Sequence, residues 1–317
     1  MSATNPGRIV LAGGSGFLGH VLADWFVARK RDVVILTRAP RAGGVIREVY
    51  WDGCSVEGWC SELDGAAAVI NLAGRTVDCR YHDRNRRLIL DSRMNSTRVL
   101  GEAIGRCSKP PGVWLNSSTA TIYKHTHGKP NDEVTGEVGA TPEANDEFSV
   151  EVAMAWERTF DAARTPMTRK VALRSAMVLG SGRNSVLPVL RRLVRCGLGG
   201  RMGGGRQFAS WIHEEDFCRA VEWLMEHEEM SGPINLAAPN PLANAEMMRV
   251  MRRLCGVRFG LPASRWMLEL GAVVLRTETE LILKSRRVAP GRLLASGFEF
   301  KFPAFEGAAG QLLSRSS

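Results

Sequence analysis

The chain has 317 residues, of which 44% are hydrophobic and 24% charged, and this composition excludes a mostly disordered protein. The net charge of +9 comes mainly from arginines that are spread through segments with helical spacing. This distribution argues against an RNA-reading surface, in which aromatic side chains alternate with basic ones. It favours a basic face that attracts an anionic cofactor or substrate.

The cysteines and the most apolar stretches set further limits. The seven cysteines are odd in number and include no C-x-x-C pair, so we expect reduced thiols without a disulfide framework or a metal site. Residues 1–7 are short and polar, and the most apolar later stretch, 266–275, is interrupted by Glu269. We therefore expect a cytoplasmic monomer or homodimer that acts on a small-molecule substrate, with neither a membrane nor a nucleic acid as partner.

A glycine-rich turn opens the patterned part of the chain. It follows the apolar run 9–12, begins a segment of helical spacing and leads to a second apolar run at 33–36. In such a strand-turn-helix, Gly13 forms the tight turn, Gly16 leaves room for a pyrophosphate and Gly19 lets the helix approach the sheet. The alternative is a glycine-rich turn without a ligand. The surrounding pattern favours a dinucleotide-binding turn with the residues Gly13, Ser15, Gly16, Phe17, Leu18 and Gly19.

The residues after the second apolar run distinguish the two nicotinamide cofactors. A carboxylate at this place binds the ribose hydroxyls of NAD, whereas an arginine accommodates the 2′-phosphate of NADP. No Asp or Glu occurs between Val33 and Gly44, while Arg38 and Arg41 lie close to the Thr37 hydroxyl. Because a guanidinium binds a phosphate through paired charge-assisted hydrogen bonds, Thr37 and Arg38 predict NADP(H). The alternative is a pair of loop arginines without a ligand.

The rest of the first half alternates between apolar runs and helical segments. We expect a short helical connection at 59–63, a long crossover helix at 84–107, and strands at 45–51, 66–73 and 113–116. The pattern predicts an α/β fold of the Rossmann type, with a doubly wound parallel sheet. A nucleotide-binding domain would span 1–182, with strands contributed by 206–240, and a smaller C-terminal substrate domain would span mainly 183–317.

The second half begins with a predicted helix at 184–196 and a loop at 197–205. This loop has six glycines in nine residues, and it either closes over a substrate or is a plain connection. His213 precedes three acidic residues, which indicates either a metal or triad site or, as we favour, a helix start capped by these acids beside a packed histidine. The remaining pattern predicts a strand at 232–238, helices at 243–254 and 262–284, and a strand or extended docking segment over 288–303.

Several motifs resemble the extended short-chain dehydrogenase/reductase superfamily of nucleotide-sugar epimerases and dehydratases. The glycine turn, the run Asn71-Leu72-Ala73-Gly74 and the run 117–123 occur in the order that this superfamily uses, and 174–180 resembles its sixth strand and following loop. The motifs at 197–200, 235–239 and 292–302 are similar to its atypical, SDR39U1-like branch of epimerase family proteins, which has a small C-terminal domain.

The resemblance implies further cofactor contacts. Leu72, Ala73 and Gly74 match the end of the fourth strand, which lines the adenine and nicotinamide riboses in this superfamily. Arg93 matches an arginine that faces the phosphates or a ribose, although it is equally well explained as a surface arginine of the crossover helix. Val178 matches the loop that covers the nicotinamide.

The resemblance is incomplete for the catalytic residues. A Ser or Thr at the end of the fifth strand polarises the substrate in this superfamily, and Thr119 matches it. The tyrosine and lysine that move the proton fall on Ser149 and Ala153, which cannot replace them, because a serine is too weak an acid and an alanine has no charge. Among the three tyrosines, at 50, 81 and 123, Tyr123 is the remaining phenol candidate, although a packing role suits it somewhat better.

Two functions follow from these residues. The first is an NADP(H)-dependent oxidoreductase or epimerase-like enzyme acting on a small, nucleotide-sugar-like substrate, with Thr119 as the polarising hydroxyl and Tyr123 or a water as the proton carrier. The second is a binding or redox-sensing protein that uses NADP(H) as a ligand without turnover.

Overall fold

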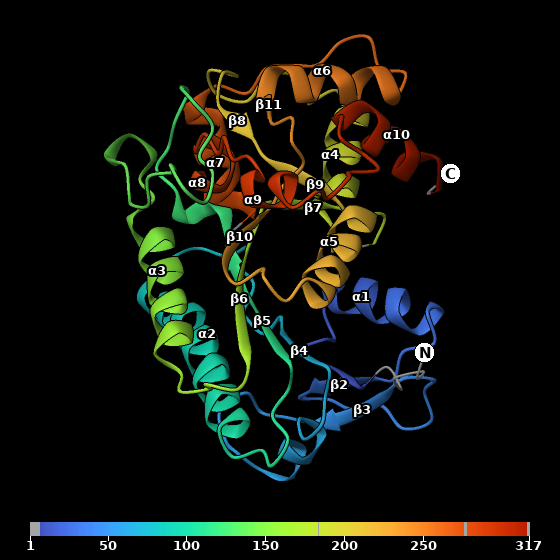
Figure 1. Cartoon of the computed structure of the whole chain (residues 1–317). Helices are drawn as coiled ribbons and strands as arrows, with labels where there is room; N and C mark the ends of the chain where they lie inside the picture. Colours follow the sequence, from blue (N-terminus) through green and yellow to red (C-terminus); the bar gives the residue numbers. More distant parts are fainter. Residues whose placement is uncertain (1–6, 183, 276–277, 316–317) are drawn as a thin grey trace.

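The computed structural model describes residues 7–182, 184–275 and 278–315, and its centre is a seven-stranded parallel sheet (Figure 1). The strands lie in the order β10-β6-β5-β4-β1-β2-β3. Their bounds are β1 (Ile9–Ala12), β2 (Val33–Thr37), β3 (Arg47–Tyr50), β4 (Ala68–Asn71), β5 (Val113–Thr119), β6 (Arg169–Ser175) and β10 (Gly232–Leu236). The predicted fold class, a doubly wound parallel sheet, is confirmed.

The strand order reverses at β1. The chain builds outward from β1 to β2 and β3 and then returns to the other side of β1 with β4. Ala12 at the end of β1 is in register with Asn71 at the end of β4. In doubly wound sheets, a ligand binds in the crevice beyond the carboxyl ends of the strands at such a reversal.

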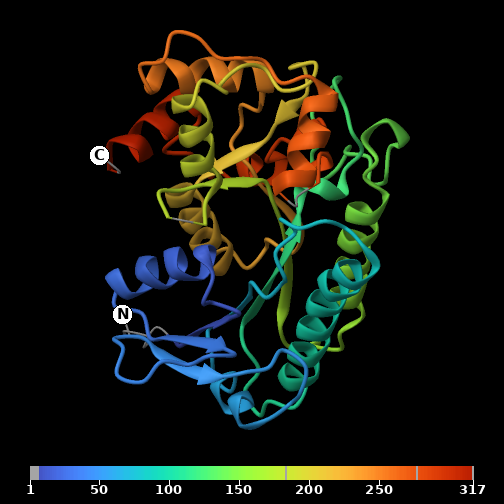
Figure 2. The ribbon, with the colours of Figure 1, turned by 180° about the vertical axis from the view of Figure 1, so that it is seen from behind.

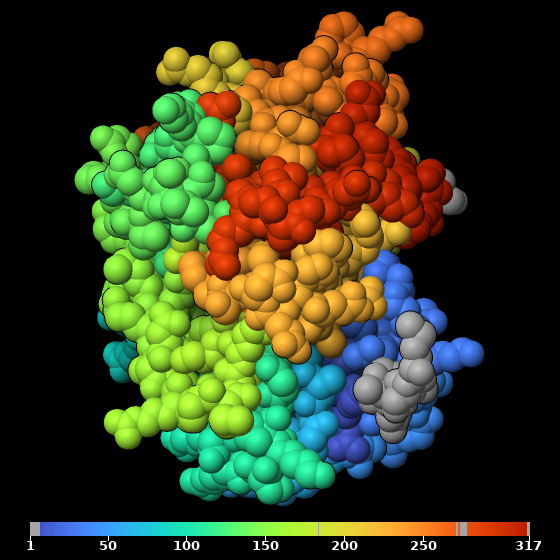
Figure 3. Space-filling view, in the orientation of Figure 1, coloured from blue at the N-terminus to red at the C-terminus, as the bar shows by residue number. Residues whose placement is uncertain are grey.

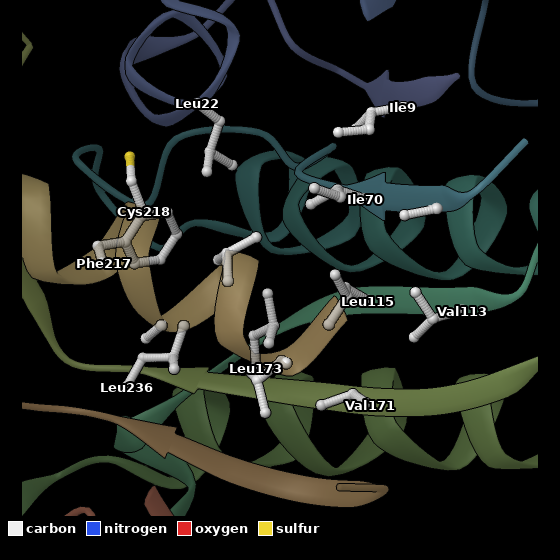
Figure 4. Packing of buried hydrophobic residues seen from close by; sticks show 14 of the residues in the cluster. Ile9, Leu22, Ile70, Val113, Leu115, Val171, Leu173, Phe217, Cys218 and Leu236 are labelled. Carbon is white, nitrogen blue, oxygen red and sulfur yellow. The ribbon is translucent and has the colours of Figure 1, made fainter. Parts of the chain in front are cut away.

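Helices cover both faces of the sheet. On one face, α1 (Phe17–Ala28) and α5 (Glu214–Glu226) bury Leu22 and Phe217 against Leu115 and Leu173 of the sheet (Figure 4). On the other face, α2 (Asp83–Ile104) and α3 (Glu147–Ala162) run side by side, as seen from behind in Figure 2. Trp114 packs against this second pair, because adjacent residues of a strand point to opposite faces.

A second core lies beyond the carboxyl ends of the strands. It joins α4 (Val186–Arg195), α6 (Asn244–Leu254) and α10 (Phe305–Arg315) through buried side chains such as Leu187, Met248 and Leu312. We call 186–209 and 242–315 the C-terminal lobe. Figure 3 shows its last residues, in orange and red, at one end of the molecule and the N-terminal residues, in blue, toward the other.

Smaller elements complete the fold. The remaining helices are α7 (Arg265–Leu275), α8 (Glu280–Leu283) and α9 (Gly291–Ala295), and the 3-10 turns are η1 (Gly58–Glu62), η2 (Ala120–Ile122) and η3 (Pro142–Ala144). Two short sheets pair β7 (Met177–Leu179) with β9 (Trp211–His213) and β8 (Phe208–Ala209) with β11 (Leu242–Ala243). Among the described residues, no helix is long and apolar enough to cross a bilayer.

The structure differs from the sequence-based expectations in two segments. The expected sixth-strand region at 174–180 is split, since β6 ends at Ser175 and β7 pairs with β9 in a separate small sheet. The phenylalanines from Phe298 to Phe302 lie in an extended segment without a strand, and the backbone N–H groups of Lys301 and Phe302 donate to Asp216 at 2.9 and 2.8 Å. Of the two predictions for this segment, a strand or an extended docking segment, the structure agrees with the second. The domain limits, 1–182 and 183–317, stay a prediction.

A buried ion pair joins α3 to the carboxyl end of the sheet. Arg174 of β6 donates to both carboxylate oxygens of Glu157, at 2.8 and 2.7 Å, and the side chains are only 9% and 14% exposed. Ser118 donates to the same carboxylate at 2.6 Å. Burial on its own lowers the pKa of Arg174, but the Glu157 carboxylate outweighs it and raises that pKa above its usual value. The pair thus fixes α3 against β5 and β6.

Replacing Arg174 with methionine should strongly destabilise the fold, because Glu157 would remain buried without its partner. We expect a loss of about 3–5 kcal/mol in the free energy of unfolding, measured by urea denaturation. The matched control is Arg249→Met, which breaks an exposed ion pair with Glu246 on α6 and should leave stability nearly unchanged. Equal losses for the two variants would contradict this account.

Candidate cofactor and active site

The glycine turn lies at the reversal of the sheet, and each predicted glycine has a distinct geometry. Gly13 has a φ of +74°, and a Cβ there would come within 2.7 Å of the Cα of Ala73 at the end of β4. A Cβ at Gly19 would overlap the carbonyl oxygen of Gly14. At Gly16, by contrast, a Cβ would meet no atom within 4 Å. The first and third glycines are therefore needed for close packing, whereas Gly16 keeps one side of the turn open.

The N-terminus of α1 faces this open side. Gly16 caps the helix without any side-chain hydrogen bond, and the first turn contains no acidic residue. The N–H groups of the first helical turn therefore have no intrahelical acceptor, and they favour an anionic group. Ser15 and Gly16 are exposed, while Phe17 and Leu18 are half-buried. This end of α1 therefore presents backbone donors of the kind that bind anions.

The end of β2 presents the predicted cofactor-selecting residues. Thr37 is buried, and its hydroxyl accepts a long hydrogen bond from the backbone N–H of Ala39 at 3.4 Å. Arg38 is exposed, and its guanidinium has no hydrogen-bond or ion-pair partner in the described part of the chain. Arg41 uses its backbone N–H, which donates to Glu48 at 2.8 Å. The Arg38 side chain is consequently available to an external anion.

A buried amide network fixes the end of β4. Asn71 donates to Asn116 of β5 at 2.7 Å and accepts from the backbone N–H of Ala73 at 3.1 Å. Thr97 of α2 joins the two amides and accepts from Trp156 of α3 at 2.9 Å. The network fixes the segment 72–74, which follows β4 and lies beside the glycine turn.

Arg93 covers this strand end. Its guanidinium donates to the backbone carbonyls of Arg75 and Ile89 at 3.1 and 3.0 Å and lies over the Trp156 ring at 5.0 Å. A Cβ at Gly74 would come within 3.2 Å of this guanidinium. Burial lowers the pKa of Arg93 to about 10, and no described carboxylate forms an ion pair with it. Arg93 is thus a half-buried cation at the crevice rather than a surface arginine.

The ends of β5 and β7 place the remaining predicted residues. Thr119 is half-buried, and its hydroxyl oxygen accepts from the backbone N–H of Thr121 at 3.1 Å, which leaves the hydroxyl hydrogen to donate elsewhere. Val178 is half-buried in β7, where it pairs with Ile212. The loop after β7 reaches the glycine turn, because a Cβ at Gly180 would overlap the Phe17 ring.

The packing around α3 leaves no room for a lysine at Ala153. Ala153 is fully buried against η2, Tyr123 and Val288, so a lysine stem would have no room there. Ser149, one turn earlier, donates to Glu280 of α8 at 2.7 Å. The C-terminal lobe therefore covers the face of α3 that contains Ser149 and Ala153.

Tyr123 is 1% exposed, and its hydroxyl has two partners. It donates to Asn235 at 3.0 Å and accepts from Arg174 at 2.9 Å. Burial raises its pKa, against the opposing effect of Arg174. This geometry favours the packing role for Tyr123 over proton transfer.

His213 serves as a helix cap. Its Nδ1 accepts from the backbone N–H of Glu215 at 3.0 Å, and its ring stacks on Phe302 at 3.9 Å. The packed-histidine interpretation is therefore right, but the histidine itself caps α5 in place of the acids.

The sequence analysis did not assign a cluster of charged residues from the C-terminal lobe. Lys284 is fully buried, forms an ion pair with Asp146 and donates to the carbonyl oxygen of Thr121 at 2.7 Å. Arg286 donates to the Thr121 hydroxyl at 3.0 Å and forms an ion pair with Glu280 at 3.4 Å. In the sequence, these charged residues stand beside the apolar run 281–283. That pattern does not indicate that their side chains contact the segment after β5.

Residues 9–237 match the model of the NAD dependent epimerase/dehydratase family. The chain belongs to this family. Residues 263–312, within the C-terminal lobe, match a domain of unknown function, DUF1731. The seven-stranded parallel sheet with helices on both faces is consistent with this family match.

Relatives of known name confirm the resemblance to the SDR39U1-like branch. The chain is 30% identical to the human epimerase family protein SDR39U1 over 301 residues, which cover 93% of this chain and 96% of the human protein. It is also 30% identical to the epimerase family protein YfhF of Bacillus subtilis over 313 residues, which cover 97% and 98% of the two chains.

Solved structures of this family share the architecture. The crystal structure of human SDR39U1 (isoform 2) with NADPH is similar with a TM-score of 0.82 and 27% identity, and the match covers 97% of this chain and 99% of that one. The UDP-glucose 4-epimerase of Thermus thermophilus in complex with NAD has a TM-score of 0.74 over 98% of both chains. At 15% identity, the latter likeness shows the shared fold alone.

The contrast between Gly19 and Gly16 can be tested through stability. Gly19→Ala should lower the free energy of unfolding by about 1–3 kcal/mol, because the new methyl group overlaps a backbone oxygen. Gly16→Ala should leave the melting temperature unchanged, since its Cβ meets open space and its φ of −88° suits alanine. Scanning calorimetry of the two variants measures both effects, and a larger loss at Gly16 would refute the assigned geometry.

Proposed function

We propose that the protein is an NADP(H)-dependent oxidoreductase or epimerase-like enzyme that acts on a small, nucleotide-sugar-like substrate. The observation that carries this proposal is the turn at the sheet reversal, where Gly16 leaves one side open beside the unpaired N–H groups of α1. The NADPH in the structure of human SDR39U1 supports the same cofactor class. The cytoplasmic location and the monomeric or homodimeric state remain predictions.

The residues of this chain fit a dinucleotide. The backbone of Gly13 and the segment 15–19 would bind the pyrophosphate, and Arg38 with Thr37 would bind a 2′-phosphate. The segment 72–74 and Arg93 would contact the riboses and a phosphate, while Val178 would cover the nicotinamide. When bound, this cofactor supplies or accepts a hydride.

Thr119 would hold the substrate. Its hydroxyl oxygen is occupied by the Thr121 N–H, so the hydroxyl hydrogen is directed to another acceptor. A substrate carbonyl or alkoxide oxygen at the end of β5 would receive that hydrogen bond. The donation stabilises negative charge that develops on this oxygen during hydride transfer.

The second candidate is an NADP(H)-binding or redox-sensing protein without turnover. It is favoured by the absence of a tyrosine and a lysine at Ser149 and Ala153, and by the tight packing that closes the Ala153 position. The cofactor contacts would be the same in both cases. Turnover therefore distinguishes the two candidates, whereas cofactor binding does not.

The cofactor preference depends on Arg38. Arg38→Ala should weaken NADPH binding about 10- to 100-fold, because a charge-assisted hydrogen bond is lost, while NADH binding should not change. Calorimetric titration with both cofactors measures this. Arg158→Ala, which removes an exposed arginine of α3, should change neither affinity. Equal or tighter binding of NADH by the unaltered protein would contradict the assignment of Arg38.

The role of Thr119 can be tested by turnover. In a metabolite screen that follows NADPH absorbance, Thr119→Val should lower kcat about 100-fold or more, because the donor to the substrate oxygen is lost. Thr119→Ser keeps the hydroxyl and should retain most of the activity. Unchanged turnover in Thr119→Val would remove this residue from the mechanism, and NADPH binding without any turnover would favour the sensor.

A further inference from the structure

Tyr81, which the sequence analysis did not choose, lies in the loop between β4 and α2, and its backbone is fixed from two sides. Its N–H donates to Glu278 of the C-terminal lobe at 2.7 Å, and its carbonyl accepts from Arg86 of α2 at 2.7 Å. The ring packs edge-on against Phe148 of α3, with centroids 4.9 Å apart. Phe148 precedes Ser149, the position at which the superfamily has its tyrosine. A phenol therefore lies beside this position, although it comes from another element.

The hydroxyl of Tyr81 is buried and has no hydrogen bond of good geometry within the described part of the chain. The nearby Ser149 hydroxyl lowers the pKa of Tyr81, but it donates its own hydrogen to Glu280 at 2.7 Å. An unsatisfied buried hydroxyl is uncommon, and it requires an explanation such as a ligand or a catalytic role. The other two tyrosines lack this property, because Tyr50 is exposed on the edge strand β3 and the Tyr123 hydroxyl has two partners.

Charged groups of both signs face Tyr81. Arg93, at the end of β4, and Arg286, bound to Thr121 beyond the end of β5, both interact with it electrostatically. The carboxylates of Glu278 and Glu280 have the opposite effect and raise the pKa of Tyr81. Burial raises the pKa of Tyr81 to about 12, so the phenol is protonated at neutral pH. The two guanidinium groups would stabilise a phenolate formed by proton transfer.

We propose that Tyr81 is the proton-transferring residue of this site, in place of the tyrosine absent from α3. The inference rests on the proposed function, in which NADPH is the reductant. In the reductive direction, the substrate carbonyl carbon gains a hydride from NADPH, and its oxygen gains the proton of Tyr81, whose O–H bond breaks. The resulting phenolate interacts electrostatically with Arg93 and Arg286 and is reprotonated from water. In the oxidative direction each step is reversed, and the phenolate accepts the proton of the substrate alcohol.

The small number of tyrosines permits a direct test that needs no substrate. Protein labelled with 3-fluorotyrosine should give three fluorine NMR resonances, which Tyr50→Phe, Tyr81→Phe and Tyr123→Phe assign. Bound NADP⁺ and NADPH differ by one positive charge on the nicotinamide ring. A phenol beside that ring therefore has different resonance positions in the two complexes. We expect this difference at Tyr81 and none at Tyr50.

The outcomes separate this inference from the proposed function. If calorimetry shows NADPH binding while the Tyr81 resonance is the same in both complexes, Tyr81 lies away from the reacting ring and the inference is wrong, although the cofactor assignment stands. Failure of NADPH to bind would overturn both. With a substrate from the turnover screen, Tyr81→Phe should lower kcat at least 100-fold at unchanged NADPH affinity, whereas Tyr50→Phe should retain full activity. Unaltered kcat in Tyr81→Phe would also overturn the inference.

Discussion

The packing of α3 against the end of β5 is the constraint on which the site depends. Ala153 is fully buried against η2, Tyr123 and Val288, so this position of α3 has no room for a long charged side chain. A cation in this region must then come from elsewhere, and the C-terminal lobe provides it. Lys284 and Arg286 reach the backbone and hydroxyl of Thr121, two residues after Thr119. If Thr119 acts as proposed, the lobe is part of the site and not only a cover for it.

The two buried phenols illustrate a physical difference between structural and reactive polar groups. Around Tyr123, every strong hydrogen-bonding group is paired: Arg174 with Glu157, and the phenol with both Arg174 and Asn235. Such a satisfied network rigidifies the fold. If one member is removed, the other polar groups stay buried without partners and the folded state is destabilised. Around Tyr81 the phenol has no hydrogen-bond partner in the described part of the chain, and Arg93 donates to backbone carbonyls without an ion-pair partner there. Polar groups without a partner are expected at functional sites, where a ligand can supply the missing hydrogen bond.

Local patterns were sufficient to predict most elements of the fold. The turn from Gly13 to Gly19, the buried strands and the crossover helix are encoded by residues that are close in sequence, and the structure has them within a few residues of the expected bounds. The pairing of β7 with β9 and the course of 298–302 depend on partners that are distant in sequence, and the local pattern did not reveal them. Tyr81 was overlooked for the same reason, because Glu278 and Ser149 lie about 200 and 70 residues away from it.

Two contacts hold the region beyond the strand ends in place. On one side, Gly180 is confined between the Phe17 ring and the Glu214 carboxylate, so that the loop after β7 rests on the glycine turn. On the other side, Lys284 pairs with Asp146 where no solvent reaches either side chain. A rigid rotation of the C-terminal lobe away from the sheet would break the second contact and leave two charges buried without partners, at a cost of several kcal/mol. The polar groups at the end of β5 are for this reason held in place before any ligand arrives, which is the condition under which fixed donors and charges stabilise a transition state most effectively.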